Sequence, residues 1–298
     1  MSAVAQPAGG AGGTGSAAAA APATPRRPSV ATIYRWELLK LRALKRTYLG
    51  FGMAVIVPAL FVAVLALRDG SGPNDIPFGR YVRETGLAIP PVLLIFGSIW
   101  LFPLIVALVA GDVVANEDGN GTLKTILTRS VDRHQVWIAK ALAALTYALL
   151  ALLLFTGVGL LLGGARYGIH PLTSLSGTRI GVGHAFGLMA AALGTYLLPV
   201  TAVVAIALLL STVTRNSAAA IVGTLMISLL IQLVGVISGL ESIRPFLLST
   251  QFDAWQGLLR QPVDWAPIVR AVWVCALYAV PCAAAGLIVF VRRDVAGG

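Results

Sequence analysis

Residues 87–110 run LAIPPVLLIFGSIWLFPLIVALVA, without one Asp, Glu, Lys or Arg. A helix rises about 1.5 Å per residue, so a run of this length crosses the roughly 30 Å hydrocarbon core of a bilayer. The whole chain of 298 residues is 57% hydrophobic and 11% charged, which leaves more apolar surface than one soluble core can bury. The stretch therefore predicts a membrane-spanning helix.

Five runs of similar length and composition lie on either side of it. Across all six runs the only charged residues are Lys140 and Arg270, each at the edge of its run. The predicted spans are Leu49–Leu67, Leu87–Ala110, Ala139–Leu162, Phe186–Leu210, Ala218–Gly239 and Ile268–Val291. We predict an all-α, polytopic membrane protein with six transmembrane helices, whose membrane domain covers residues 30–298.

The basic residues predict how these spans are oriented. An even number of spans places both termini on one side, and that side carries 14 of the 22 lysine and arginine residues, including all four lysines. Basic residues concentrate on the cytoplasmic side of membrane proteins. We therefore expect a multi-pass protein of the cell membrane with cytoplasmic N- and C-termini.

The N-terminal region divides into two parts. Residues 1–29 are mostly Ala, Gly, Pro, Ser and Thr, which is typical of a disordered tail, and they lack the hydrophobic core of a cleaved signal peptide. From Val30 to Tyr48 an apolar stripe lies beside a row of arginines with helical spacing. The pattern predicts an amphipathic helix at the membrane surface, with a basic extension of the first span as the alternative. The stripe is Tyr34, Leu38, Leu41, Leu44 and Tyr48, and the row is Arg35, Arg42 and Arg46.

Several other classes of function fit the composition poorly. The net charge of +10 comes from residues that flank apolar runs, which favours lipid headgroups over a phosphate backbone, so we expect no nucleic-acid partner. Cys275 and Cys282 are about 10.5 Å apart along one helix, too far for a disulfide. The three histidines are scattered and the acidic cluster lacks a catalytic spacing, so we expect no catalytic, cofactor or metal site in this chain.

The segment between the second and third spans, GDVVANEDGNGTLKTILTRSVDRHQVW at 111–137, carries the most information. Its carboxylates Asp112, Glu117 and Asp118 precede a Gly-Asn-Gly breaker. Residues 122–129 then have helical spacing, with Leu123, Ile126 and Leu127 on one face. Asp132 with Gln135 three residues later is a capping box, which predicts the start of the next helix. We expect a short helix that lies crosswise at the inner membrane surface.

These residues resemble the ABC-2 type permeases of ATP-binding-cassette transporters. The family pattern between spans two and three is matched by Glu117, Gly121, Thr122, Leu123, Leu127, Arg133 and Lys140. The resemblance covers residues of about 30 to 295 and includes the basic N-terminal helix and the six spans. It implies that the short helix is a cytoplasmic coupling helix, which docks on a separate ATPase (nucleotide-binding) subunit. The alternative is a solvated loop that only caps two long helices.

The resemblance also implies roles and partners. The contact with the ATPase would comprise Glu117, Gly121, Thr122, Leu123, Lys124, Ile126, Leu127, Arg129 and Arg133. The chain has no G-x-x-x-x-G-K-[ST] phosphate loop, so ATP and Mg²⁺ would bind to that partner. Two permease copies, or one copy and a homologue, would pair with two ATPases in the bilayer. The apolar spans suit export of a hydrophobic or amphipathic substrate.

A longer outer segment precedes the last span. Phe252, Trp255, Leu258 and Leu259 have helical spacing there, and Phe246 lies shortly before them. By resemblance, Phe246, Phe252, Trp255 and Leu258 belong to a re-entrant helical pair that forms an outer gate. The alternative is an interfacial loop with Trp255 and Trp265 in the headgroup belt.

A carrier driven by ions remains the alternative to an ABC permease, together with any other six-span membrane protein. Ion-coupled carriers usually place ionisable residues at mid-membrane. The spans here offer only neutral polar groups such as Gln232, which favours the permease.

Overall fold

The computed structural model describes residues 29–67, 76–119, 121 and 132–292. It contains six helical segments long and apolar enough to cross a membrane, and they coincide with the six predicted spans. Five of them are the helices α2 (Lys45–Leu67), α7 (Arg133–Tyr167), α8 (Val182–Thr214), α9 (Ser217–Val236) and α11 (Ala266–Arg292). The all-α membrane fold predicted from the sequence is confirmed.

The second span is built from several pieces. They are η2 (Gly86–Ala88), α3 (Ile89–Phe96), the π-helical turn η3 (Gly97–Leu101), α4 (Phe102–Ala110) and the single turn α5 (Ala115–Gly119). In the π turn the Phe102 N–H donates to the carbonyl of Gly97. A Cβ on Gly97 would lie 2.8 Å from the Phe102 ring, so only glycine allows that ring to pack beneath the turn.

The N-terminal helix α1 (Val30–Ala43) begins at an N-cap, Ser29, whose hydroxyl accepts from the Thr32 N–H. The predicted helix to Tyr48 is interrupted, because Leu44 is extended and α2 starts at Lys45. Its apolar stripe lies largely against protein: Leu41 is buried and Tyr34 is partly buried against the core, whereas Tyr48 is 62% exposed. Packing on α7, rather than lipid alone, therefore holds α1 in place.

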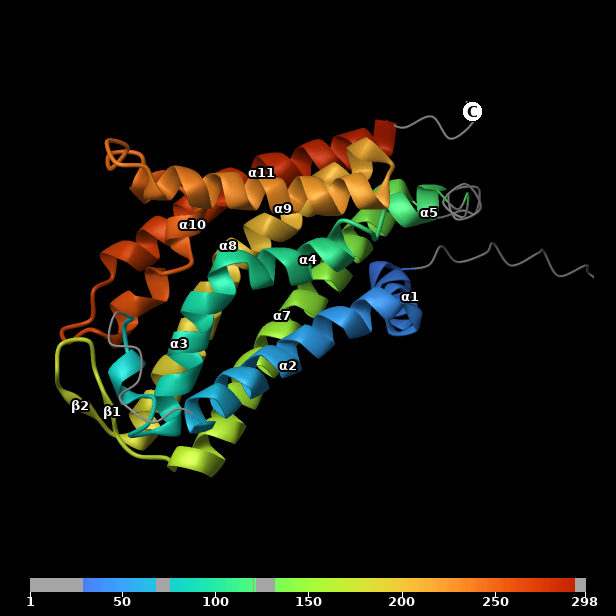
Figure 1. Cartoon of the computed structure of the whole chain (residues 1–298). Helices are drawn as coiled ribbons and strands as arrows, with labels where there is room; N and C mark the ends of the chain where they lie inside the picture. The colour runs from blue at the N-terminus through green and yellow to red at the C-terminus, as the bar shows by residue number, and fades with distance from the viewer. Residues whose placement is uncertain (1–28, 68–75, 120, 122–131, 293–298) are drawn as a thin grey trace, which may run out of the picture.

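The two ends of the helical bundle carry different structures (Figure 1). One end, called the α1 end, carries α1, α5 and the last turn of α11. The other, called the hairpin end, carries the antiparallel strands β1 (Leu172–Thr173) and β2 (Arg179–Ile180). The short helices η1 (Gly79–Tyr81), η4 (Arg244–Phe246), α10 (Leu248–Gln251) and η5 (Ala254–Leu259) complete the parts outside the spans.

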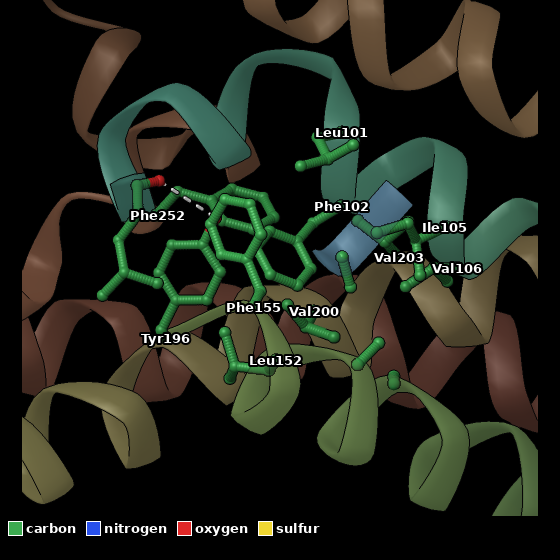
Figure 2. Close-up of a cluster of buried hydrophobic side chains, with 14 of the residues drawn as sticks. Leu101, Phe102, Ile105, Val106, Leu152, Phe155, Tyr196, Val200, Val203 and Phe252 are labelled. Atoms are coloured by element: carbon green, nitrogen blue, oxygen red, sulfur yellow. Dashed lines mark hydrogen bonds between the residues drawn. The ribbon is translucent and has the colours of Figure 1, made fainter. Parts of the chain in front are cut away.

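An aromatic cluster fills the middle of the bundle (Figure 2). The Phe102 ring lies edge-on to Phe155 of α7 and to Tyr196 of α8, each with centroids 5.2 Å apart. Phe252, just after α10, packs on Tyr196 at 5.1 Å. Tyr196 is more than three helical turns from the start of α8, so the chain after α9 turns back into the bundle.

Candidate functional site

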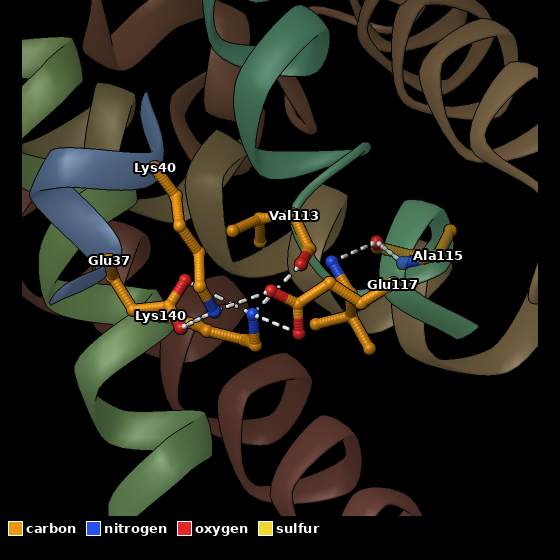
Figure 3. A network of polar contacts seen from close by, with 8 residues as sticks. Glu37, Lys40, Val113, Ala115, Glu117 and Lys140 are labelled. Carbon is orange, nitrogen blue, oxygen red and sulfur yellow. Dashed lines mark hydrogen bonds and ion pairs between the residues drawn. The ribbon is translucent and has the colours of Figure 1, made fainter. Parts of the chain in front are cut away.

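A closed ring of charges joins three helices at the α1 end (Figure 3). Lys40 Nζ donates to Glu37 Oε1 at 2.9 Å and to Glu117 Oε1 at 2.8 Å. Lys140 Nζ lies 3.1 Å from Glu37 Oε2 and 2.7 Å from Glu117 Oε2. Each ammonium therefore bridges both carboxylates, and each carboxylate uses both its oxygens.

Burial makes this ring a strong constraint. The Lys140 side chain is 0% exposed and that of Glu37 is 4% exposed. A buried charge is costly unless it is paired and hydrogen-bonded. Lys140 meets that requirement with the two carboxylates and with the Val113 carbonyl, 3.1 Å away. Two positive and two negative groups leave the ring neutral.

Lys40 is the most exposed member of the ring. Burial by itself lowers the pKa of its ammonium, but the neighbouring carboxylates of Glu117 and Glu37 act in the opposite direction and hold the pKa above the ordinary 10.5. Lys40 therefore stays charged at neutral pH.

The position of each ring residue follows from its helix. Glu37 lies on the buried face of α1 with Ile33 and Leu41, one helical turn away on either side. Lys140 is on the buried face of α7, two turns into that helix. Glu117 lies in α5, which is anchored to α8 because the Ser211 hydroxyl accepts from the N–H groups of Val114 and Ala115 at 3.2 and 3.0 Å (Figure 3).

A second buried carboxylate ties the same segment to two further spans. Asp112 is 2% exposed and forms an ion pair with Arg46 of α2. The same carboxylate accepts a hydrogen bond from the Ser217 hydroxyl, at the first residue of α9. The six residues from Asp112 to Glu117 are thus bound to α1, α2, α7, α8 and α9.

The predicted coupling residues divide between described and undescribed parts. Glu117 is in the ring, and Gly121 has a φ of +69°, a conformation that favours glycine. Arg133 is the first residue of α7 and donates to the Val291 carbonyl of α11 at 3.0 Å. Helix α7 begins after Asp132, as predicted, but the Asp132 side chain makes no capping hydrogen bond, so the capping box itself is not formed. Thr122, Leu123, Lys124, Ile126, Leu127 and Arg129 lie outside the described residues.

Sequence reasoning missed two of the four ring residues, Glu37 and Lys40. Glu117 and Lys140 were part of the family pattern, but nothing in that pattern indicated that they touch. Glu37 is the one acidic residue of α1, in a helix otherwise rich in Lys and Arg, and it lies on the apolar side of that helix. An acidic residue placed so predicts a buried basic partner, and this signal was available.

The predicted gate residues lie mostly inside the hairpin end. Trp255 is fully buried and stacks on Phe78 with centroids 6.4 Å apart, so it does not reach a headgroup belt, whereas Trp265 is 60% exposed. Leu258 is also buried. Phe246 is half exposed and lies edge-on to Trp273 of α11 at 5.6 Å.

The described residues contain no group of three or more His, Cys, Asp or Glu side chains that could hold a metal ion. Comparison with protein families shows that the family model described as ABC-2 family transporter protein matches residues 33–235. This range is more than half of the chain and runs from α1 almost to the end of α9, so it includes the whole ring. No curated protein matches the chain.

Proposed function

This chain belongs to the ABC-2 family of transporter proteins, and we propose that it is the permease subunit of an ABC exporter whose energy comes from ATP hydrolysis on a separate nucleotide-binding subunit. The family implies association with an ABC ATPase and with the bilayer. Members are membrane components of transporters, generally without a catalytic site of their own.

The observation that carries the proposal is the ring of Glu37, Lys40, Glu117 and Lys140. One of its members, Glu117, precedes residues 122–129 in the sequence, which form the predicted short helix that would dock on the ATPase. Removing one partner from a buried pair costs about 3–5 kcal/mol, so the ring moves as a unit rather than opening. A displacement of the docking segment would therefore move both α1 and α7 with it, because Glu117 is bound to both helices.

Two more contacts extend the same linkage. Asp112 connects the segment to α2 and α9, and Arg133 connects its far end to α11. ATP-driven closure of the partner would thereby reach most of the spans at once. The partner binds ATP and Mg²⁺ and hydrolyses the ATP, and this chain transmits the resulting movement to its membrane spans.

The proposed assembly places the α1 end in the cytoplasm of a cell, with two permease chains and two ATPases. The excess of Lys and Arg at that end supports the orientation. At the opposite end, Phe246, Phe252, Trp255 and Leu258 would form the outer gate. Their packing supports this role: Trp255 stacks on Phe78 just before η1 and Phe246 lies against α11. Phe252 reaches from there into the aromatic cluster on α8.

An ion-coupled carrier is supported less well. Such a carrier needs ionisable groups near the middle of the membrane. Among the described residues the buried charged side chains are Glu37, Asp112 and Lys140, and all three lie at the α1 end. Hydroxyls within the spans, such as those of Thr156 and Thr201, donate to carbonyls of their own helix instead.

The test is reconstitution of the full chain with the ABC ATPase that copurifies with it, in nanodiscs, followed by ATPase assays. Leu123→Asp with Leu127→Asp should abolish assembly, because charged side chains would replace the apolar docking face. Glu117→Gln should leave assembly intact but lower the ATPase rate of the complex about tenfold, since about 1.4 kcal/mol of coupling corresponds to that factor.

The matched control is Glu84→Gln, the same change at an exposed residue of the hairpin end, which should behave as wild type. If no ATPase binds the chain, the permease proposal fails and the ion-coupled carrier becomes the favoured function. If assembly survives the Leu123 and Leu127 substitutions, the docking site lies elsewhere.

A further inference from the structure

An apolar groove of about 330 Å³ opens between α2 and the π turn η3. Its walls include Leu60, Phe61 and Val64 of α2 and Phe96, Gly97 and Trp100 of the second span. The lining residues are all apolar or aromatic, and the Trp100 indole supplies the one side-chain polar atom among them. Such a wall suits hydrocarbon and offers almost nothing to a charged or strongly polar group.

The groove lies within the membrane-spanning part of the molecule. The α2 wall is in the second half of that helix, and the opposite wall lies in the middle of the predicted span Leu87–Ala110. Leu60 is 61% exposed and Trp100 is 50% exposed, so the opening faces the bilayer. A ligand can therefore enter sideways from the lipid without crossing water.

The π turn forms one wall of the groove. A side chain on Gly97 would point at the Phe102 ring in the core, so this glycine allows the ring to pack directly behind that wall. Phe61 and Phe96, with centroids 6.0 Å apart, form one edge where the two helices do touch. Single π turns inside α-helices occur frequently at functional sites, where the extra residue displaces the neighbouring side chains.

We propose that this groove binds the alkyl chain of the transported molecule, which is an amphiphile that enters laterally from the bilayer. The inference deepens the proposed function and rests on it. Pockets that bind drug-sized ligands have volumes of about 300–1,000 Å³, so this groove lies at the small end of that range and accommodates one chain, with the head group outside it.

The packing beneath the turn is the reason to assign a transported molecule rather than bulk lipid. Gly97 contacts Phe102, Phe102 packs on Tyr196, and Tyr196 packs on Phe252 of the proposed outer gate. An occupant of the groove therefore presses on a turn whose underside connects to that gate. The gate also touches α11, where Phe246 lies edge-on to Trp273 at 5.6 Å, but the groove differs from that surface in offering an apolar volume of about 330 Å³.

The test uses the full chain in phosphatidylcholine nanodiscs and a twelve-carbon alcohol that carries a diazirine on its chain. After photolysis, mass spectrometry should locate the adducts on peptides that cover 57–64 and 93–101, and unlabelled dodecanol should compete with this labelling. Leu60→Trp fills the groove and should lower labelling at least about fivefold, as expected for overpacking a defined cavity. Leu277→Trp, at a residue of α11 with 63% exposure, is the matched control and should change nothing.

Labelling that dodecanol does not reduce, or that is equal on α9 and α11, would mean bulk lipid contact and would overturn the site. The second arm measures stimulation of the reconstituted ATPase by dodecanol, which Leu60→Trp should abolish and Leu277→Trp should leave intact. Competed labelling without that loss would overturn the assignment to a transported molecule. Competed labelling of a chain that binds no ATPase would instead leave the site standing and defeat the proposed function.

Discussion

Lys140 is a buried lysine whose charge depends on two carboxylates from other helices. Removing it as Lys140→Met leaves Glu37 and Glu117 with only Lys40, so one buried negative charge loses its partner. We expect the midpoint of thermal unfolding in detergent to fall, with a loss of about 3–5 kcal/mol of stability. Glu37→Gln should cost a similar amount, because it leaves a positive charge unpaired.

The double variant tests whether these residues form one unit. The double variant Glu37→Gln/Lys140→Met removes one charge of each sign. Its loss of stability should therefore be at least about 1 kcal/mol smaller than the sum of the losses of the two single variants. Strict additivity would show that the ring is a set of independent contacts. Glu84→Gln, exposed at the hairpin end, should stay within about 0.5 kcal/mol of wild type.

Lys40 allows a prediction about pH. Its pKa is raised above 10.5 by Glu117 and Glu37, against the effect of burial, so its contribution to stability is fully present below its ordinary pKa. That contribution is lost as the pH rises through the raised pKa. The difference in unfolding midpoint between wild type and Lys40→Met should therefore be constant from pH 7 to about 10 and shrink above that. A difference that shrinks between pH 7 and 9 would contradict the assigned direction.

The residue scale is where the sequence was least informative. Glu117 and Lys140 could be named from the family pattern, yet their contact with Glu37 could not, because it depends on how α1 packs on α7. By hydropathy alone, Glu37, the single acidic residue of a basic helix, would be predicted to lie at the surface. Only the combination of its position on the apolar side of the helix with a lysine inside a span would have predicted the pair.

At the scale of single elements, the spans were the easiest features to predict. Lipid requires long apolar helices, so composition alone locates the ends of α11 to within two residues, those of α8 to within four and those of α7 to within six. The break at Leu44 and the π turn could not be predicted in this way. Both depend on tertiary packing. The break at Leu44 depends on how α1 docks on the bundle, and the π turn depends on the aromatic side chain of Phe102 beneath Gly97.

The π turn can be tested through its glycine. Gly97→Ala would bring a methyl group within 2.8 Å of the Phe102 ring, so the turn or the ring must move. We expect a loss of about 1–3 kcal/mol of stability, typical of overpacking. Gly157→Ala on α7 is the control, because a Cβ there meets nothing within 4 Å, and it should be neutral or slightly stabilising. Equal effects of the two changes would mean that the turn does not require glycine.

At the scale of the whole molecule, the two ends differ in how they are held. The α1 end is joined by buried charges from several helices, which resist separation. The hairpin end is joined by contacts that are individually weaker: the Leu175 N–H donates to the Leu259 carbonyl at 3.0 Å, and the Gln261 N–H donates to the Ser176 hydroxyl at 2.9 Å. A molecule built in this way would open at the hairpin end when the α1 end moves as a block.

A crosslink between the hairpin and the outer segment tests that order of events. Thr178→Cys with Gln261→Cys, in a chain whose Cys275 and Cys282 are replaced by alanine, pairs two positions whose side chains now meet, because the Thr178 hydroxyl donates to Gln261 Oε1 at 2.6 Å. Oxidation should leave ATPase assembly unchanged, because the α1 end is not touched. It should lower the ATPase rate of the complex about tenfold if opening of the outer end belongs to the cycle, and reductant should restore the rate.

The control variants carry only one of the two cysteines, and neither oxidant nor reductant should change their ATPase rate. A crosslinked complex that hydrolyses ATP at the wild-type rate would show that the hairpin end stays closed throughout the cycle, and the gate would then have to be sought along the lateral opening between α2 and the π turn.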